Sequence, residues 1–98
     1  MPTYTFSAPL WRWEARADSW YFITLPKDES DELRDIPRPP RGFGSIQVKV
    51  TIGGSTWSTS VFPDAQRSGC YVLPVKRAVR DAEGIEHDDT VEVTVEVV

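Results

Sequence analysis

The sequence predicts a mainly β fold: a small closed barrel of six or seven strands, built from two split half-units, with one amphipathic and one short α-helix. Apolar and polar residues alternate with a period of two in several segments, which is typical of strands with one buried face. Each half of the chain also contains a strand that ends in Leu-Pro, a helical segment and a return strand. Two such units that close on each other leave no free sheet edge, so many short strands are compatible with a monomer.

Length and composition limit the number of domains and the class of protein. We expect residues 1–98 to form one domain, because a second core would need about 50 residues of its own. With 40% hydrophobic and 27% charged residues, the chain matches neither a disordered acidic tail nor a membrane protein. A single cysteine, the lack of a signal-peptide pattern and the lack of a long apolar run predict a cytoplasmic protein without a membrane partner.

The N-terminal half contains a predicted hairpin and the short helix. Residues 4–13 and 20–25 are rich in strand-favouring side chains and are separated by a polar segment. Pro26 begins a helix of one or two turns, whose acidic residues suit the positive end of the helix dipole. Leu33 and Ile36 are its expected buried anchors.

The C-terminal half carries the clearest period-two pattern. Residues 46–52 alternate between aliphatic and polar side chains, and residues 55–62 follow after Gly53-Gly54, so the two segments form a predicted hairpin. Residues 91–97 alternate valine with Glu and Thr and predict a strand with one buried and one solvated face.

The amphipathic helix is predicted between Pro74 and Gly84. Proline suits the first turn of a helix, and glycine suits the position just after its end. Apolar residues recur at i, i+3, i+4 and i+7 and predict one buried stripe: Val75, Ala78, Val79 and Ala82. Three cations are expected to face away from it: Lys76, Arg77 and Arg80.

Six sequence blocks occur in order, within a match that runs over essentially the whole chain: LWRW (10–13), WYFITLP (20–26), GFGSI (42–46), TIGG (51–54), WSTSVFP (57–63) and LPVKRAVR (73–80). Together they resemble a bacterial family catalogued only as a domain of unknown function. The resemblance implies a double-split β-barrel, with AbrB-like swapped-hairpin regulators and antitoxins as distant structural relatives. Some members of the family are fused to domains linked with bacteriocin protection. The resemblance implies no established activity.

One turn departs from the family pattern. Where the family usually has Gly-Asp before the last strand, this chain has Asp88-Asp89. If the first position of that turn needs a positive φ, aspartate adopts it less easily than glycine and more easily than most other residues.

The chain offers few groups for catalysis or metal binding. His87 is its only histidine and Cys70 its only cysteine, so neither a His-rich nor a Cys-based metal site can form within one chain. We expect a solvated histidine and a buried, inert thiol within a strand rather than a nucleophile pair. The sequence therefore predicts no enzyme activity and no cofactor.

The four tryptophans have two interpretations. Trp11, Trp13, Trp20 and Trp57 either fill the barrel, which we favour, or form a stacking surface for a ligand. If Leu10 points inward, Trp11 and Trp13 point outward, because neighbouring residues of a strand face opposite sides.

Lys76, Arg77 and Arg80 form the only compact basic group of the sequence. Solvation of a surface helix explains such a group, and capture of an anionic ligand or an acidic protein segment is the functional alternative. We expect these cations, Trp57 and Ser58 to border one groove at the mouth of the barrel. Cations and free N–H groups beside a tryptophan ring suit a small aromatic or acyl anion.

The leading functional prediction is therefore a non-catalytic, monomeric domain that binds a small ligand or a protein. A DNA-binding regulator of the AbrB-like type comes second and a hydrolase third. A formal net charge of −4 disfavours nucleic acid as a partner, because it repels the phosphate backbone.

Overall fold

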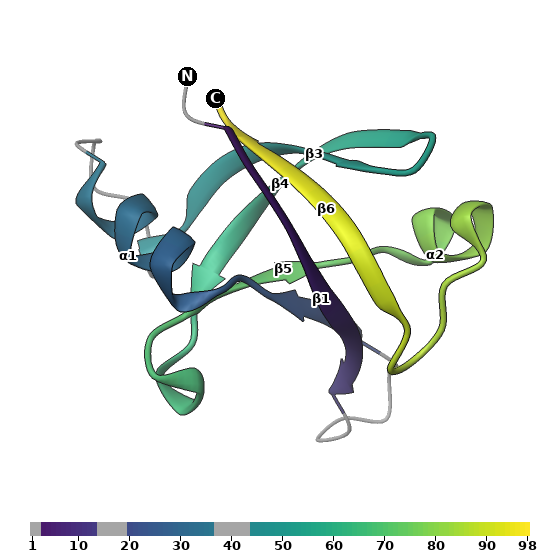
Figure 1. Cartoon of the computed structure of the whole chain (residues 1–98), viewed down its shortest axis with the longest axis horizontal. Coiled ribbons are helices and arrows are strands. Elements are labelled where there is room, and N and C mark those ends of the chain that lie inside the picture. The colour runs from purple at the N-terminus through teal and green to yellow at the C-terminus, as the bar shows by residue number, and fades with distance from the viewer. Residues whose placement is uncertain (1–2, 14–19, 37–43) are drawn as a thin grey trace.

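The computed structural model describes residues 3–13, 20–36 and 44–98. They form these elements: β1 (Thr3–Trp13), β2 (Trp20–Thr24), α1 (Lys27–Asp35), β3 (Ile46–Ile52), β4 (Ser55–Pro63), a 3-10 turn (Ala65–Arg67), β5 (Tyr71–Pro74), α2 (Arg77–Glu83) and β6 (Thr90–Val97). The strands close into an antiparallel barrel in the order β1-β2-β5-β4-β3-β6 (Figure 1). The predicted mainly β barrel with two helices is confirmed.

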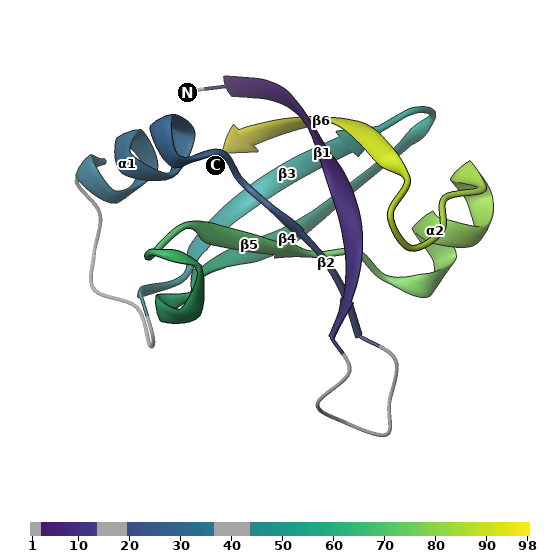
Figure 2. The same cartoon turned by 60° about the horizontal axis from the view of Figure 1, so that its bottom comes forward.

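The two halves of the chain are interleaved in this barrel. One half supplies β1, β2, α1 and β3, and the other supplies β4, β5, α2 and β6. Exchanging β1, β2 and β3 with β4, β5 and β6 leaves the set of neighbouring strands unchanged. The repeat of strand, Leu-Pro and helix in the sequence is therefore matched by the strand order, and the two helices lie at opposite sides of the barrel (Figure 2). The double-split class stays a prediction.

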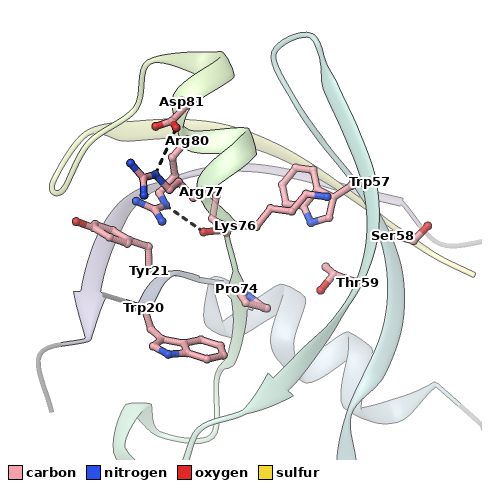
Figure 3. Close-up of a pocket in the computed structure, with 11 residues that line it drawn as sticks. Trp20, Tyr21, Trp57, Ser58, Thr59, Pro74, Lys76, Arg77, Arg80 and Asp81 are labelled. Atoms are coloured by element: carbon pink, nitrogen blue, oxygen red, sulfur yellow. Dashed lines mark hydrogen bonds and ion pairs between the residues drawn. The ribbon is translucent and has the colours of Figure 1, made fainter. Parts of the chain in front are cut away.

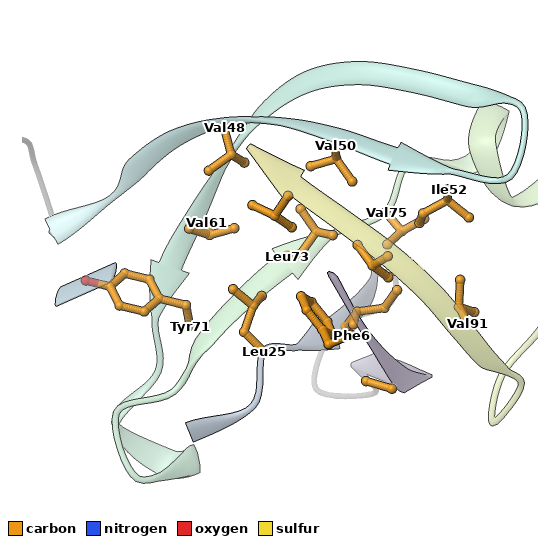
Figure 4. Close-up of a cluster of buried hydrophobic side chains, with 14 of the residues drawn as sticks. Phe6, Leu25, Val48, Val50, Ile52, Val61, Tyr71, Leu73, Val75 and Val91 are labelled. Carbon is orange, nitrogen blue, oxygen red and sulfur yellow. The ribbon is translucent and has the colours of Figure 1, made fainter. Parts of the chain in front are cut away.

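The core consists almost entirely of aliphatic side chains from the inner strand faces (Figure 4). Ile46, Val48, Val50 and Ile52 of β3 are buried, and the alternate residues of β3 are exposed or half-buried. The same alternation buries the valines of β6. The period-two pattern of the sequence therefore identified the inner face of both strands correctly.

None of the four tryptophans belongs to this core, so the expectation that they fill the barrel is wrong. Leu10 is fully buried, and Trp11 and Trp13 point outward, as their alternation with Leu10 predicts. Trp13 and Trp20 are 39% and 48% exposed, and Trp57 is half-buried at the edge of the core. Valine, isoleucine and leucine fill the narrow interior, which leaves the indole rings outside.

Helix α1 is longer than the one or two turns expected. Its nine residues make about 2.5 turns and follow Pro26, as predicted. Leu33 is fully buried, whereas Ile36 is only partly buried beyond the end of the helix. Ser30, which the sequence analysis did not single out, is the buried polar residue of this helix.

Helix α2 begins later than predicted. Pro74 pairs with Phe22 of β2, and Val75 N donates to the Tyr21 carbonyl oxygen at 2.9 Å, so the chain stays extended up to the helix. Gly84 ends the helix with φ +63°, as expected. Of the predicted stripe, Val75 and Val79 are buried and Ala78 and Ala82 are exposed. The predicted buried stripe is therefore wrong for Ala78 and Ala82, because the seven-residue helix packs on the barrel through a single buried side chain, Val79.

Two single-residue predictions have different outcomes. Asp88 has φ +71°, so the turn before β6 does require the left-handed region. Cys70 lies in the turn before β5 and is half-buried, which contradicts the expected buried thiol within a strand. Within the described ranges, no helix has the length and apolar character needed to cross a membrane.

Candidate functional site

A groove opens where β4 and β5 separate. β4 pairs with β3 along Ser55–Val61, but it pairs with β5 only at Phe62 and Pro63. β5 turns away to pair with β2, which leaves a wedge-shaped opening between β4 and β5. Helix α2 follows β5 in the chain and lies across the open end of this wedge. The barrel is therefore closed by a short junction on this side, and the rest of β4 faces open space.

This space forms a cavity of about 860 Å³. All five residues expected to border one groove line it: Trp57, Ser58, Lys76, Arg77 and Arg80 (Figure 3). Trp57 and Thr59 of β4 point into the cavity, whereas the hydroxyl of Ser58 points away from it. The structure brings the predicted group together, with Ser58 at the rim.

The three cations have different surroundings. Arg80 Nε donates to the Val75 carbonyl oxygen at 3.2 Å, and its guanidinium carbon lies 3.9 Å from the centre of the Tyr21 ring. Arg77 Nε lies 3.6 Å from Asp81 Oδ2, but the two side chains are 84% and 70% exposed, so this ion pair is weak. Lys76 is exposed, and its ammonium group has no ion-pair or hydrogen-bond partner among the described residues.

These differences separate binding cations from structural ones. The Arg80 side chain bonds to the Val75 carbonyl oxygen and lies over the Tyr21 ring, so it holds α2 against β2. Lys76 extends into the cavity toward Trp57 (Figure 3). Lys76 and Arg77 are therefore the cations that can turn to an incoming anion at little cost.

The far end of α2 is fixed to the β3–β4 hairpin. Ser55 Oγ donates to Glu83 Oε2 at 2.6 Å, and Gly54 N donates to Glu83 Oε1 at 3.3 Å. Gly53 has φ +56°, and a Cβ atom there would overlap the Glu83 carboxylate. Together with buried Val79, these contacts make α2 a fixed wall of the groove.

An outward-facing aromatic surface continues from the groove. We define it as the outer aromatic face: Trp11, Trp13, Trp20 and Phe22. Trp20 stacks on Phe22 with 6.2 Å between ring centres and also lines the cavity. At the opposite end, the Arg67 guanidinium lies 3.7 Å from the centre of the Trp11 ring.

The structure thus adds residues that the sequence analysis missed. Trp20 and Tyr21 line the cavity because β2 pairs with β5, and Glu83 holds α2, one wall of the cavity, to the hairpin. The sequence analysis considered Trp20 for a stacking surface but did not place it in the groove, and both Trp20 and Tyr21 lie within one of the family-like blocks. Glu83 carries no local signal, because its contact depends on the packing of α2 against a distant hairpin.

The groups considered for catalysis lie in turns. His87 Nδ1 accepts a hydrogen bond from the Arg12 backbone N–H at 3.2 Å, and its ring is about half exposed, as expected. Cys70 precedes β5, and within the described part of the chain no hydrogen bond joins it to His87. The described ranges contain no cluster of His, Cys, Asp or Glu that could hold a metal ion.

Comparison with known proteins gives a family and no activity. No curated protein matches the chain. A family model described as "Domain of unknown function (DUF1905)" matches residues 6–95, which include both helices and most of every strand. The chain therefore belongs to the DUF1905 family, as a member of a class of domains of unknown function.

Proposed function

We propose that this protein is a non-catalytic binding module whose groove between β4 and α2 holds an anionic ligand. The observation that carries this proposal is the composition of one cavity. Lys76 and Arg77 lie on one side of it, and the aromatic rings of Trp20 and Trp57 lie on others. A volume of about 860 Å³ falls in the range of sites that take small molecules or short segments of chain.

The charges favour carboxylate or phosphate groups. The Lys76 ammonium is a compact positive charge that has no partner among the described residues, and Arg77 can leave its weak, exposed pair with Asp81. The indole ring of Trp57 offers an apolar face beside these cations. An anion with an aromatic or acyl body would use both features.

Thermal unfolding with a panel of aromatic and acyl carboxylates tests this proposal. A ligand present at 100 times its dissociation constant stabilises the folded state by about 2.7 kcal/mol. We expect one or more members of the panel to raise the melting temperature of the wild type. The double variant Lys76→Ala/Arg77→Ala should lose this rise and keep its own melting temperature, because both side chains are exposed.

Lys27→Ala is the matched control. Lys27 is an exposed lysine at the start of the other helix and carries the same charge. Its removal should leave the ligand-induced rise intact. A panel without any stabilising anion, or an equal loss in the Lys27→Ala variant, contradicts the proposal.

A further inference from the structure

We propose, on the basis of the proposed anion-binding function, that the occupant of the groove is an extended acidic peptide segment that adds as a strand to the free edge of β4. Main-chain groups of β4, and not only the cations, bind this partner. The partner is a protein segment with acidic side chains in an extended conformation.

The orientation of the β4 backbone follows from its two partners. Residues of an antiparallel strand direct their N–H and C=O groups alternately to the two neighbouring strands. Phe62 pairs with Val72 of β5, and Asp64 N donates to the Cys70 carbonyl oxygen at 3.0 Å. The even-numbered residues of β4 therefore face the β5 side.

Ser58 and Ser60 consequently direct their N–H and C=O groups toward the side from which β5 has turned away. β4 and β5 are paired only at Phe62 and Pro63, and in this register Pro74, which has no N–H for the Ser60 carbonyl oxygen, comes opposite Ser60. Among the described residues, the segment 75–76 that follows bonds to Tyr21 and to α2, and makes no backbone bond to Ser58. Trp57 and Thr59 direct theirs to Val50 and Val48 of β3. β4 thus carries a free sheet edge inside a barrel that is otherwise closed.

β5, on the opposite side of the wedge, cannot pair with this free edge of β4. Pro74 lies in β5 on the side that faces β4 and has no N–H to donate, as is usual where a strand edge is left unpaired. Glu83 holds α2 to the β3–β4 hairpin, and Val75 N donates to the Tyr21 carbonyl oxygen, so the segment that follows β5 is bound to β2 rather than to β4. The wedge therefore stays open for an external strand.

A peptide uses more of this groove than a small anion does. A free carboxylate can pair with Lys76 and Arg77, but it leaves the edge of β4 to water. An added strand pairs with Ser58 and Ser60 through its main chain, which is the basis of strand addition to sheet edges. Its side chains alternate between two faces, so acidic residues at every second position can reach the cations. Positive charge at the rim favours a segment of negative charge.

Amide hydrogen exchange of the intact protein, followed by NMR, tests the proposal. The probe is a short peptide of alternating Glu and Thr, and a peptide with Lys in place of Glu is its control. In the free protein we expect the Ser58 and Ser60 amides to exchange fast and those of Trp57 and Thr59 to exchange slowly. A saturating amount of the acidic peptide should slow Ser58 and Ser60 by about tenfold or more and leave Trp57 and Thr59 unchanged.

A second peptide separates main-chain pairing from charge. Methylation of alternate backbone nitrogens keeps every carboxylate but removes the N–H groups that pair with β4. The methylated peptide should bind about tenfold more weakly than the parent peptide if the peptide adds as a strand to the edge of β4. Equal affinity of the two peptides overturns the inference.

The remaining outcomes distinguish this inference from the proposed function. If the acidic peptide binds and Lys76→Ala/Arg77→Ala weakens it, while Ser58 and Ser60 exchange as before, the anion site stands and strand addition is wrong. If neither peptide nor carboxylate binds, both are wrong. If Ser58 and Ser60 become protected in the protein alone as its concentration rises, a second copy occupies the edge and the inference is overturned.

Discussion

The two half-units of the barrel follow one strand plan but differ in the charged residues around their helices. Five acidic residues lie on α1: Asp28, Glu29, Asp31, Glu32 and Asp35. Three cations surround the start of α2: Lys76, Arg77 and Arg80. The shared strand order supplies the framework of both halves, and the side chains of the helix decide which half can attract an anion.

The helices also differ in how they are attached. Below α1, buried Ser30 donates to the Leu25 carbonyl oxygen at 3.3 Å and accepts from Tyr71 N at 3.0 Å. α2 is attached at its rim by Arg80 and Glu83, which are partly exposed. Both helices have a buried apolar anchor, so the difference lies in their polar contacts: those of Ser30 in α1 are buried, and those of Arg80 in α2 lie beside an open cavity.

The largest effect should come from the apolar anchors of the two helices. Leu33→Ala in α1 should lower the free energy of unfolding by about 2–5 kcal/mol, and Val79→Ala in α2 by about 1–3 kcal/mol, because both side chains are buried. Urea denaturation measures both losses. Arg77→Ala is the exposed control on α2 and should cost less than about 0.5 kcal/mol. Equal losses for Val79→Ala and Arg77→Ala would show that the assigned buried face is wrong.

The next effect concerns the buried hydroxyl of the first half. Ser30→Ala leaves the Tyr71 N–H without its hydroxyl acceptor and should cost about 1–3 kcal/mol. Ser58→Ala, at an exposed position of the second half, should cost less than about 0.5 kcal/mol. Urea denaturation that finds the two serines equivalent contradicts the interior attachment of α1.

A smaller loss of stability is expected at the β3–β4 hairpin, which contacts α2 through Glu83. Gly53→Ala should destabilise the protein by about 1–2 kcal/mol, because alanine is strained at φ +56° and its Cβ displaces Glu83. Glu83→Ala removes the displaced carboxylate, so the two changes together should cost less than the sum of the single losses. Additive losses in thermal unfolding would argue against the contact between α2 and the hairpin.

The smallest expected effect is a pH dependence of stability that comes from Tyr4 of β1, in the half that contains the acidic helix α1. Burial, with Glu32 and Glu29 of α1 nearby, raises the pKa of Tyr4 above its ordinary value of 10.0. The folded protein therefore holds the phenol proton more tightly than the unfolded chain does. This contribution to stability is full below the unfolded pKa and is lost as the pH rises through the folded pKa. Tyr4→Phe should flatten the decline in stability above pH 10.0, and an unchanged decline rejects this assignment.

The sequence analysis succeeded where a signal is local. Alternation in β3 and β6 identifies the inner face, and the paired glycines identify the hairpin, because both depend on near neighbours. Asp88 marks a turn in the sequence, and in the structure this residue has a positive φ. Strand existence and hairpin register therefore follow from residues that are close in the chain.

Features that depend on distant segments were not predictable in this way. Pro74 looks like the start of a helix, but pairing with Phe22 keeps it in a strand. Alternation predicts that Trp11 and Leu10 face opposite sides, but the burial of Leu10 rather than Trp11 depends on the pairing of β1 with β2 and β6. In the groove, the cations could be found from their spacing, whereas the structural role of Arg80 depends on the position of Tyr21.

An NMR titration with benzoate tests most directly whether the anion site belongs to the α2 half. We expect the largest chemical-shift changes at the indole N–H of Trp57 and at the backbone amides of Lys76 and Arg77, which line the cavity. The chemical shifts of two other groups should not change: the indole N–H of Trp11, which donates to Thr24 Oγ1 at 2.9 Å, and the amide of Lys27 in α1. Larger changes at Trp11 or along α1 than at Trp57 would contradict the account.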